Sequence, residues 1–438
     1  MLIQFSTRNY KIFKEKVVFS LVASNYDKDT RESENVRSIA DLNLRILKGA
    51  VVYGANASGK SKFMEALNFM RSFTLRSSRD SQKGDPIGVE PFKLNTESEN
   101  DSSEFELIFL IGNEMFRYGF EASPNKIEAE WLYHKPKTKE VEIFYRDGQE
   151  FNLHRTFAKG NTLVKEGLVR DNALLLSVAA QFNDQLSGKI INWFKGLKSI
   201  SGIHEEGYRG YTMRRTEDSS YKKKILDLLK AADFGIQDIS IETKDISNLP
   251  KEMPKKVKDL LFKKLTEENA SIVDVITSHR KYDLSGNHSG DVYFSLDVEE
   301  SSGTQKFFSL TGPILDVLEN GFTLFVDELD SKLHPNLVCK IVSLFNSKES
   351  NPKNAQLVFN THDTNLLSSG LFRRDQIWFT EKDRYGEAKL YSLTEFKSEV
   401  RRTENFEENY IRGKYGAVPF LSEFETLISS NRLLADEK

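Results

Sequence analysis

The chain has 438 residues, and at roughly 150 residues per domain this length predicts about three structural units. Hydrophobic residues make up 39% and charged residues 29%, which supports a sizeable core and excludes a disordered, collagen-like or disulfide-rich protein. No apolar run of about 18 residues occurs and the N-terminus lacks an apolar signal core, so we expect no membrane-spanning helix and no signal peptide. The single cysteine, Cys339, fits a reducing cytosol, so a cytoplasmic location is expected. The net charge of -3 argues against nonspecific coating of nucleic acid but leaves room for a local basic stripe.

The hydrophobic pattern of the first 154 residues predicts mostly strands. An apolar run over 47–54 that ends in glycine predicts a buried parallel strand, because such strands are apolar on both faces. Apolar residues at helical spacing then predict an amphipathic helix over 60–73. The polar residues 25–41 predict a mobile loop. Alternating residues predict two opening strands and an antiparallel meander with one buried face, over 2–6, 16–21, 104–110, 115–121, 126–134 and 141–147.

The pattern changes in the second half of the chain. Residues 155–285 are predicted to be mostly helical, with a charged, Gly-containing flexible loop over 205–220. The helices expected there cover 171–182, 185–197, 221–232 and 254–265, and strands return at 291–297, 322–328, 355–361 and 376–382. These elements predict an α/β fold in which a central, mostly parallel sheet is joined by the antiparallel meander. The expected division is an N-terminal lobe (1–154), a helical insertion or lid (155–285), a C-terminal lobe (286–399) and a helical tail (400–438).

A phosphate-binding loop is predicted at residues 54–61, where GANASGKS matches G-x-x-x-x-G-K-[ST]. Glycines let the backbone wrap closely around an anion, and the helix that begins here adds the positive end of its dipole. In this pattern Lys60 reaches the β- and γ-phosphates and the Ser61 hydroxyl ligates Mg²⁺. A chance match in a turn is the alternative, but the strand before and the helix after supply the context that the motif requires. The predicted nucleotide-binding residues are Gly54, Asn56, Ser58, Gly59, Lys60, Ser61 and Lys62.

Two further strands end in residues suited to phosphate chemistry. Asp327 and Glu328 end the strand over 322–328, where Asp327 would hold Mg²⁺ and Glu328 would act as general base on the attacking water. His362 ends the next strand, where it could contact the γ-phosphate. Taken singly, an acidic strand end is common and a lone histidine is more often structural. The phosphate loop in the same chain favours the functional interpretation.

A small polar turn, SSGTQ at 301–305, precedes a predicted helix. Ser302, Gly303 and Gln305 would form a second anion site at the N-terminus of that helix. By itself this feature is weak evidence, because Ser-Gly turns are widespread.

In this order, the elements resemble the motifs of an ABC-type P-loop ATPase head of the SMC-like and OLD-like branch. GANASGKS resembles Walker A, SSGTQ the signature motif, LFVDE (324–328) Walker B, LDSKLHP (329–335) the D-loop, and His362 the switch histidine. The signature departs from the usual LSGGQ at Ser301 and Thr304. The turn RNYKIF (8–13) is similar to a first-strand turn that lies near the adenine, which implies nucleotide contacts for Arg8 and Asn9. The resemblance also implies slow, dimerisation-dependent ATP hydrolysis in a homodimer or a larger ring.

Within that branch, YGANASGKS, the PFKL segment (91–94) and RGKYGAVPFL (412–421) most resemble stand-alone ATPases of bacterial anti-phage operons. Examples are the RloA/AbiL-like proteins and the ATPase subunit of the PARIS system. The resemblance implies a sensor or scaffold subunit of a two-component abortive-infection system, with a phage-encoded trigger and a separate effector, often a nuclease. The chain beyond His362 is too short for a nuclease domain with its own metal core, so the effector would be another protein.

Two other functions stay open at this stage. An SMC-like DNA-binding repair ATPase would use the lysine-rich insertion, although solvated helix faces explain these lysines without a ligand. The lysines concerned are Lys222, Lys223, Lys224, Lys255, Lys256 and Lys258. A non-catalytic scaffold could use ATP only to stabilise an assembly, although the complete Asp327–Glu328 pair argues against it.

Overall fold

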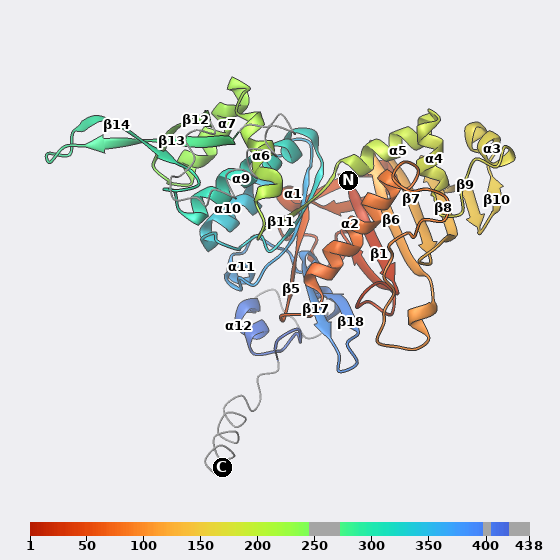
Figure 1. Ribbon diagram of the computed structural model, residues 1–438. Coiled ribbons are helices and arrows are strands. Elements are labelled where there is room, and N and C mark those ends of the chain that lie inside the picture. The colour runs from red at the N-terminus through yellow and green to blue at the C-terminus, as the bar shows by residue number, and fades with distance from the viewer. Residues whose placement is uncertain (245–271, 397–403, 420–438) are drawn as a thin grey trace, which may run out of the picture.

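The computed structural model describes residues 1–244, 272–396 and 404–419. These residues form a central sheet, a larger antiparallel sheet and a small three-stranded sheet, with helices packed between and around them (Figure 1). The helix predicted over 254–265, and the tail 400–438 apart from 404–419, lie outside the described residues.

The central sheet has the strand order β11-β15-β16-β5-β17-β18. Every neighbouring pair is parallel except β17 and β18, so the predicted mostly parallel sheet is confirmed. The strands are β5 (Gly49–Gly54), β11 (Leu197–Ser201), β15 (Thr323–Asp327), β16 (Gln356–Asn360), β17 (Ile377–Lys382) and β18 (Ala388–Ser392).

Both faces of this sheet are buried, which explains the continuous apolar runs in its strands. Ala50 and Val52 of β5 pack into one core cluster, and Val51 and Tyr53 into the other. The first cluster lies against α2 (Lys60–Arg76) and the antiparallel sheet, and the second against α9 (Ser302–Asn320) and α10 (Pro335–Asn346). Successive side chains of a strand point to opposite faces, so one short strand supplies both cores.

The antiparallel sheet has the order β10-β9-β8-β7-β6-β1-β2. It contains the four predicted meander strands and the two opening strands, because β1 pairs with both β2 and β6. Its strands are β1 (Leu2–Arg8), β2 (Val17–Ser20), β6 (Ser103–Ile111), β7 (Glu114–Ala122), β8 (Ile127–Lys135), β9 (Val141–Asp147) and β10 (Glu150–Leu153). Alternation holds best in β6, where Phe105, Leu107 and Phe109 are fully buried.

A buried glutamine joins the two large sheets. The Oε1 atom of Gln356 accepts from Leu2 N (2.6 Å) and from Thr323 Oγ1 (3.1 Å). Its Nε2 atom donates to the carbonyls of Leu2 and Leu47, both at 2.9 Å. One side chain at the start of β16 in the central sheet therefore bonds to the backbone of Leu2 in the antiparallel sheet, which links the two sheets.

The remaining elements surround these layers. The helices are α1 (Glu32–Asn35), α3 (Ala158–Lys165), α4 (Leu175–Gln181), α5 (Gln185–Lys195), α6 (Glu206–Arg215), α7 (Ser219–Ala231), α11 (Asn365–Ser368) and α12 (Phe406–Ile411). The small sheet consists of β12 (Ile236–Lys244), β13 (Ile272–Tyr282) and β14 (His288–Ser295), and β3 (Val36–Ile39) pairs with β4 (Leu44–Leu47). The β13–β14 hairpin projects from the body at the left of Figure 1.

Within 155–285 the helical prediction is right for α3, α4, α5 and α7 and wrong for three strands. Strand β11 completes the edge of the central sheet beside β15, and β12 and β13 pair in the small sheet. The loop prediction over 205–220 is wrong as well, because α6 forms there and packs closely on α9. A Cβ on Gly312 of α9 would lie 2.4 Å from Thr212 Oγ1 of α6, so the two helices approach through that glycine.

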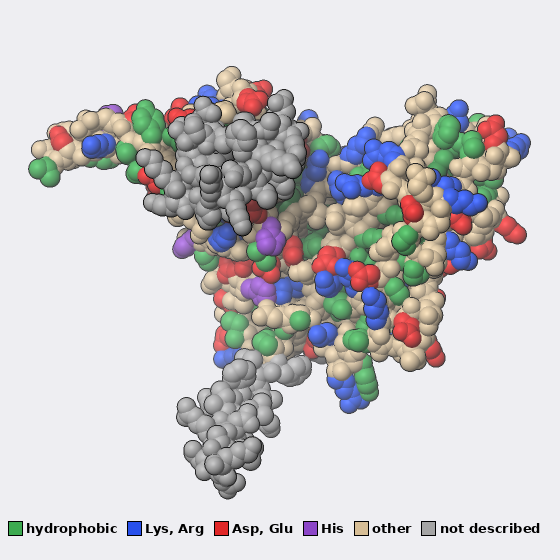
Figure 2. Space-filling view, viewed as in Figure 1, with side chains coloured by type: hydrophobic (Ala, Val, Ile, Leu, Met, Phe, Trp, Pro, Cys, Tyr) green, Lys and Arg blue, Asp and Glu red, His purple; other side chains and the backbone are tan. Residues whose placement is uncertain are grey.

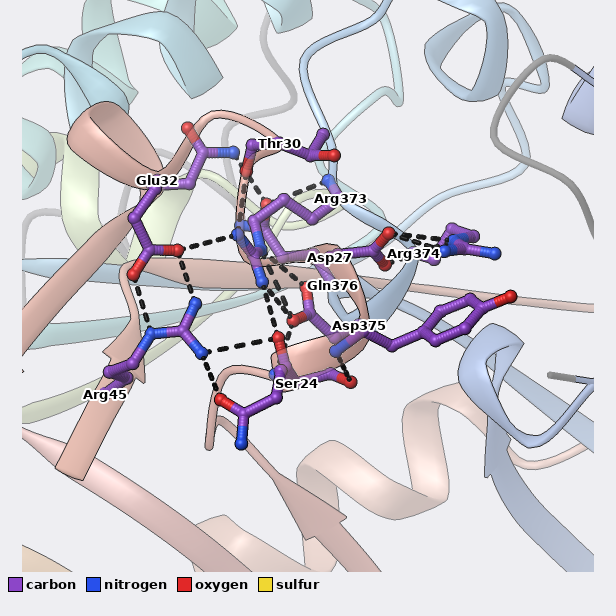
Figure 3. Close-up of polar contacts among 12 residues, drawn as sticks. Ser24, Asp27, Thr30, Glu32, Arg45, Arg373, Arg374, Asp375 and Gln376 are labelled. Atoms are coloured by element: carbon purple, nitrogen blue, oxygen red, sulfur yellow. Dashed lines mark hydrogen bonds and ion pairs between the residues drawn. The ribbon is translucent and has the colours of Figure 1, made fainter. Parts of the chain in front are cut away.

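The polar stretch 25–41, predicted to be a mobile loop, is held in place by a buried ion-pair network (Figure 3). Arg373 is fully buried and donates to Asp375 (2.7 Å), Glu32 (2.9 Å) and the carbonyl of Thr30 (2.7 Å). Arg374 pairs with Asp27 at 2.6 Å. Apart from Asp375, the partners are some 340 positions apart in the chain, so the pattern of charges gave no sign of their pairing.

Candidate functional site

Three parallel strands bring the predicted nucleotide motifs to one edge of the central sheet. Strand β16 lies between β5 and β15, with Asn360 paired to Val52 and Phe359 to Val326. Because the strands are parallel, the phosphate loop after β5, the carboxylates of β15 and His362 after β16 all follow carboxyl ends at the same edge. The ligand crevice of an open α/β sheet lies at this edge.

The phosphate loop is tightly packed against β17 and the first hairpin. A Cβ on Gly54 would lie 2.5 Å from the carbonyl oxygen of Thr380, so no side chain fits there. Gly59, with φ of 126°, begins α2 from a backbone conformation that favours glycine. The Ser58 hydroxyl lies 2.7 Å from that of Thr380 and anchors the middle of the loop, while Asn56 is exposed. The loop therefore has the close backbone approach and the helix N-terminus that an anion requires.

Lys60 folds back over the loop. Its ammonium group donates to the carbonyls of Gly54 (2.7 Å) and Ala55 (3.1 Å). Burial lowers the pKa of Lys60 to about 8, while the negative charges of Glu328 and Asp327 act in the opposite direction. The charges of both carboxylates thus act on Lys60, which is the relation expected of a triphosphate site. Lys62 instead points outward and pairs with Glu65 at 2.7 Å.

Asn360, which no sequence motif marks, orients the two carboxylate residues. Its Nδ2 donates to Asp327 Oδ1 at 2.5 Å, and its Oδ1 accepts from Glu328 N at 2.7 Å. Glu328 has φ of 57°, the left-handed region that a glutamate rarely adopts. This conformation turns the chain after Asp327, so that two residues adjacent in sequence no longer alternate as in a strand. Backbone strain of this kind costs free energy and is concentrated at active sites and ligand-binding sites.

Two other residues hold the carbonyl of Glu328. Gly202, after β11, packs so closely that a Cβ there would lie 1.9 Å from that oxygen. Lys306 of α9 is fully buried and donates to the carbonyls of Glu328 (3.3 Å) and Ser331 (2.5 Å). Burial lowers the pKa of Lys306 to about 8. The helix that follows the signature turn is therefore linked directly to the Glu328 turn.

The signature turn lies at an exposed helix N-terminus. Ser301 caps α9 by accepting from Thr304 N at 3.1 Å, and Ser302 is exposed. Gln305 donates back to the carbonyl of Glu300 at 3.1 Å. Gly303 lies against the carbonyl of Lys332, 3.0 Å from where its Cβ would be. The turn is thus next to the segment 329–335 that resembles a D-loop.

The remaining predicted site residues are His362, Arg8 and Asn9, of which His362 is exposed and Asn9 is buried. His362 is exposed, and its main-chain N–H donates to Asp330 at 3.2 Å. Arg8 pairs with Asp101 at 2.9 Å. Asn9 is buried and donates to the carbonyls of Ser98 (2.8 Å) and Asp101 (3.0 Å). These bonds tie the first turn to the 92–102 segment, so a nucleotide role for Arg8 and Asn9 stays a prediction.

Magnesium would have two protein ligands here, the Ser61 hydroxyl and Asp327. Ser61 is half-buried at the first turn of α2, and Asp327 keeps Oδ2 available while Oδ1 accepts from Asn360. Among the described residues no group of three or more His, Cys, Asp or Glu side chains could hold a metal. A hydroxyl and one carboxylate fit Mg²⁺ of the kind that is completed by phosphates and water, rather than a metal held by the protein alone.

A family model described as "AAA domain, putative AbiEii toxin, Type IV TA system" matches residues 50–368. The match covers more than half of the chain, from the phosphate-loop strand through His362. The chain belongs to this family. It is therefore an ATP-binding P-loop AAA-domain ATPase, so the ATP binding expected from the sequence is confirmed, while the roles of single residues stay predictions.

Among solved structures, SMC head domains are similar to this AAA-domain ATPase at low sequence identity. The SMC head domain from Thermotoga maritima is 11% identical, with a TM-score of 0.40, over 89% of this chain and 98% of that chain. An SMC head bound to the C-terminal winged-helix domain of ScpA is 12% identical, with a TM-score of 0.41, over 89% and 97%. No curated protein matches the sequence. In the described parts of the ATPase, no helix is long and apolar enough to cross a membrane.

Proposed function

We propose that this ATPase hydrolyses Mg-ATP at the edge formed by β5, β16 and β15, with Glu328 as general base. The observation that supports this is the position of Asn360 on the strand next to β5, at the sheet edge where the phosphate loop begins, where it bonds to both Asp327 and Glu328. A protein that only bound nucleotide would have no need of a glutamate held in a left-handed conformation beside the metal-binding aspartate.

The roles of the residues follow from their chemistry. The N–H groups of the loop 54–61 and the positive end of α2 bind the phosphates, and Lys60 exchanges its two carbonyl partners for phosphate oxygens. Bound Mg²⁺ would neutralise charge on the phosphates, held by Ser61 and Asp327. Glu328 accepts a proton from the attacking water, while exposed His362 is placed to contact the γ-phosphate.

We further propose that two copies of the chain close over the nucleotide. The exposed Ser302 and the half-buried Gly303, at the N-terminus of α9, would bind the γ-phosphate held by the neighbouring copy. ATP would then favour the dimer or a ring built from dimers, and hydrolysis would release it. The buried bonds from Lys306 to the Glu328 turn support this scheme, because they connect one copy's signature helix to its own catalytic turn.

The biological role that we propose is a sensor or scaffold subunit in a two-component abortive-infection system. The family description, which names an AbiEii toxin, and the sequence resemblance to anti-phage ATPases support it. A separate effector, expected to be a nuclease, and a phage-encoded trigger complete the scheme. Affinity purification of the tagged chain from infected and uninfected cells tests it, since an effector held by the ATPase should be recovered and its amount should change on infection.

Single-turnover hydrolysis tests the catalytic proposal directly. The purified chain, in excess over labelled ATP, should convert it to ADP, whereas Lys60→Ala should not bind the triphosphate. Lys222→Ala, which removes a half-buried lysine of α7 that pairs with Asp238, serves as the control and should retain activity. Tight ATP binding without any turnover would instead favour a non-catalytic scaffold.

A DNA-binding repair ATPase is the second candidate, and the described lysines give it little support. Lys222 pairs with Asp238 at 2.8 Å and Lys224 with Glu319 at 2.5 Å, so the charges of two of the three described lysines are compensated within the chain, and Lys223 is exposed. Lys255, Lys256 and Lys258 lie outside the described residues. Binding of duplex DNA with an affinity that falls steeply as the salt concentration rises would support this second function.

A further inference from the structure

A pocket far from the nucleotide edge has a lining with four basic side chains and no acidic one. It has a volume of about 400 Å³, within the usual range for small-ligand sites, and lies between the C-terminal half of α2 and helices α4 and α5. The basic residues are Arg71, Arg76, Arg79 and Lys195. In a chain with a net charge of -3, such a concentration of positive charge calls for an explanation.

Arg71 is the most informative of the four residues. Its Nε atom is buried and has no hydrogen-bond partner among the described residues. Burial lowers the pKa of Arg71, and the charge of Arg76 lowers it further. A partly buried guanidinium without a carboxylate is costly, because desolvation is not offset by an opposite charge.

The helix dipole explains only part of this arrangement. Arg76, in the last turn of α2, is placed where a cation stabilises the helix C-terminus, and it also lies 3.8 Å from Asp80. Arg71 lies more than a turn earlier, where the dipole effect has faded. Within the described part of the chain, the Arg79 side chain donates only to the carbonyl of Leu75, and Lys195 donates to the side-chain oxygen of Asn192, so these bonds neutralise neither charge.

The rest of the lining suits a phosphate. Ser78 and Ser177 line the pocket and bond to each other, Oγ to Oγ, at 2.8 Å, and Gln181 adds an amide. Arg170 donates to the carbonyls of Ser77 and Ser78, which fixes the segment that follows α2. Guanidinium groups bind tetrahedral oxyanions through two parallel hydrogen bonds, and hydroxyls supply further donors.

We propose that this pocket binds a phosphate group carried by a nucleotide or by a strand of nucleic acid. It is distinct from the ATP site, because Lys60 and Arg71 are 11 residues apart on one helix, or about 16 Å at 1.5 Å per residue. Figure 2 shows Lys and Arg side chains gathered over this part of the surface, where a longer polyanion could extend beyond the pocket. Binding at this pocket does not require hydrolysis at Glu328. The two proposals can therefore be tested independently of each other.

The test uses the full chain carrying Lys60→Ala, so that the phosphate loop does not contribute. Pyrophosphate is titrated by calorimetry, and a fluorescein-labelled single-stranded 12-mer by anisotropy, at two salt concentrations. At least one probe should bind, more weakly at high salt, and Arg71→Met should weaken it about 10-fold or more, the usual effect of losing a charged hydrogen bond. Comparable binding of pyrophosphate identifies the small-molecule source, and binding of the 12-mer alone identifies nucleic acid. Binding of neither probe overturns the proposal.

Two controls separate binding from folding. Lys189→Met, on the exposed side of α5 where Lys189 pairs with Glu114, should leave the affinity unchanged. Arg71→Met should unfold at the same temperature as its parent or higher, because an uncompensated charge is removed. Arg79→Gln and Lys195→Gln, at the exposed rim, should each weaken the same probe. Unchanged affinity in these rim variants, or in Arg71→Met, contradicts the proposal.

Discussion

The side-chain amide of Asn360 donates to Asp327 Oδ1 at 2.5 Å. The same side chain accepts from the main-chain N–H of Glu328, so one residue of β16 orients both acidic residues at the end of β15. In the proposed mechanism, Asp327 holds the metal while Glu328 activates water. Asn360 would therefore act through both of them without contacting the nucleotide.

Replacing Asn360 should impair hydrolysis more than binding. Asn360→Leu keeps the volume but removes both hydrogen bonds, which should destabilise the protein by about 1–3 kcal/mol, because the buried N–H of Glu328 loses its acceptor. We expect single-turnover hydrolysis to fall at least 10-fold while ATP affinity changes little, since the phosphate loop is intact. Asn336→Ala, an exposed asparagine on α10, is the matched control. Equal losses of affinity and rate would mean that Asn360 supports the fold of the whole edge instead.

Glu328→Gln should separate chemistry from assembly. The amide keeps the shape of the side chain but cannot accept a proton, so hydrolysis should slow by about 10²–10⁴-fold. ATP should still bind, and the variant should accumulate as a dimer or larger ring, measured by light scattering with and without ATP. Glu349→Gln, an exposed glutamate, controls for the lost charge. Undiminished turnover would remove Glu328 from the role of general base.

The sequence predicted the elements of the site well, because each has a strong local signature. The buried strand β5, the glycine loop and α2 follow one another without a gap, and β15 and β16 are apolar on both faces. The alternation of the apolar residues Phe105, Leu107 and Phe109 with polar neighbours likewise predicted a strand of the antiparallel sheet.

What could not be predicted depends on partners distant in the chain. Strand β11 is short and only its first residue is fully buried, so nothing local distinguishes it from the end of helix α5. Helix α6 contains two glycines and no clear apolar face, and it forms because Thr212 packs on Gly312. Asn360 looked like an ordinary strand end, since its role depends on Asp327, some thirty positions away.

Lys306→Met should change how stability depends on pH. The pKa of Lys306 is lowered by burial from 10.5 to about 8, with Asp330 and Glu205 acting against that shift and Lys332 with it. Below pH 8 the lysine is charged in both states. Between about pH 8 and 10.5 the unfolded chain holds more protons than the folded protein, so the free energy of unfolding of the wild type should rise with pH relative to that of the variant. Urea unfolding at pH 7.5 and 9.5 measures this difference, and a constant offset between the two proteins would contradict the shift.

Arg373→Met should destabilise the protein without changing the ATP site. Arg373 is fully buried and bonds to Asp375 and Glu32, so its loss leaves the buried carboxylate of Asp375 without its ion-pair partner, which usually costs about 3–5 kcal/mol. The network precedes β17 at the end opposite the phosphate loop, because β17 runs parallel to β5 and Gly54 pairs with Thr380 at its other end. ATP affinity at a temperature where the variant is folded should therefore match the wild type. Arg384→Met, an exposed arginine after β17 that stacks on Tyr385, should leave stability nearly unchanged. If Arg373→Met unfolds at the same urea concentration as the wild type, the network does not hold residues 24–32 in place.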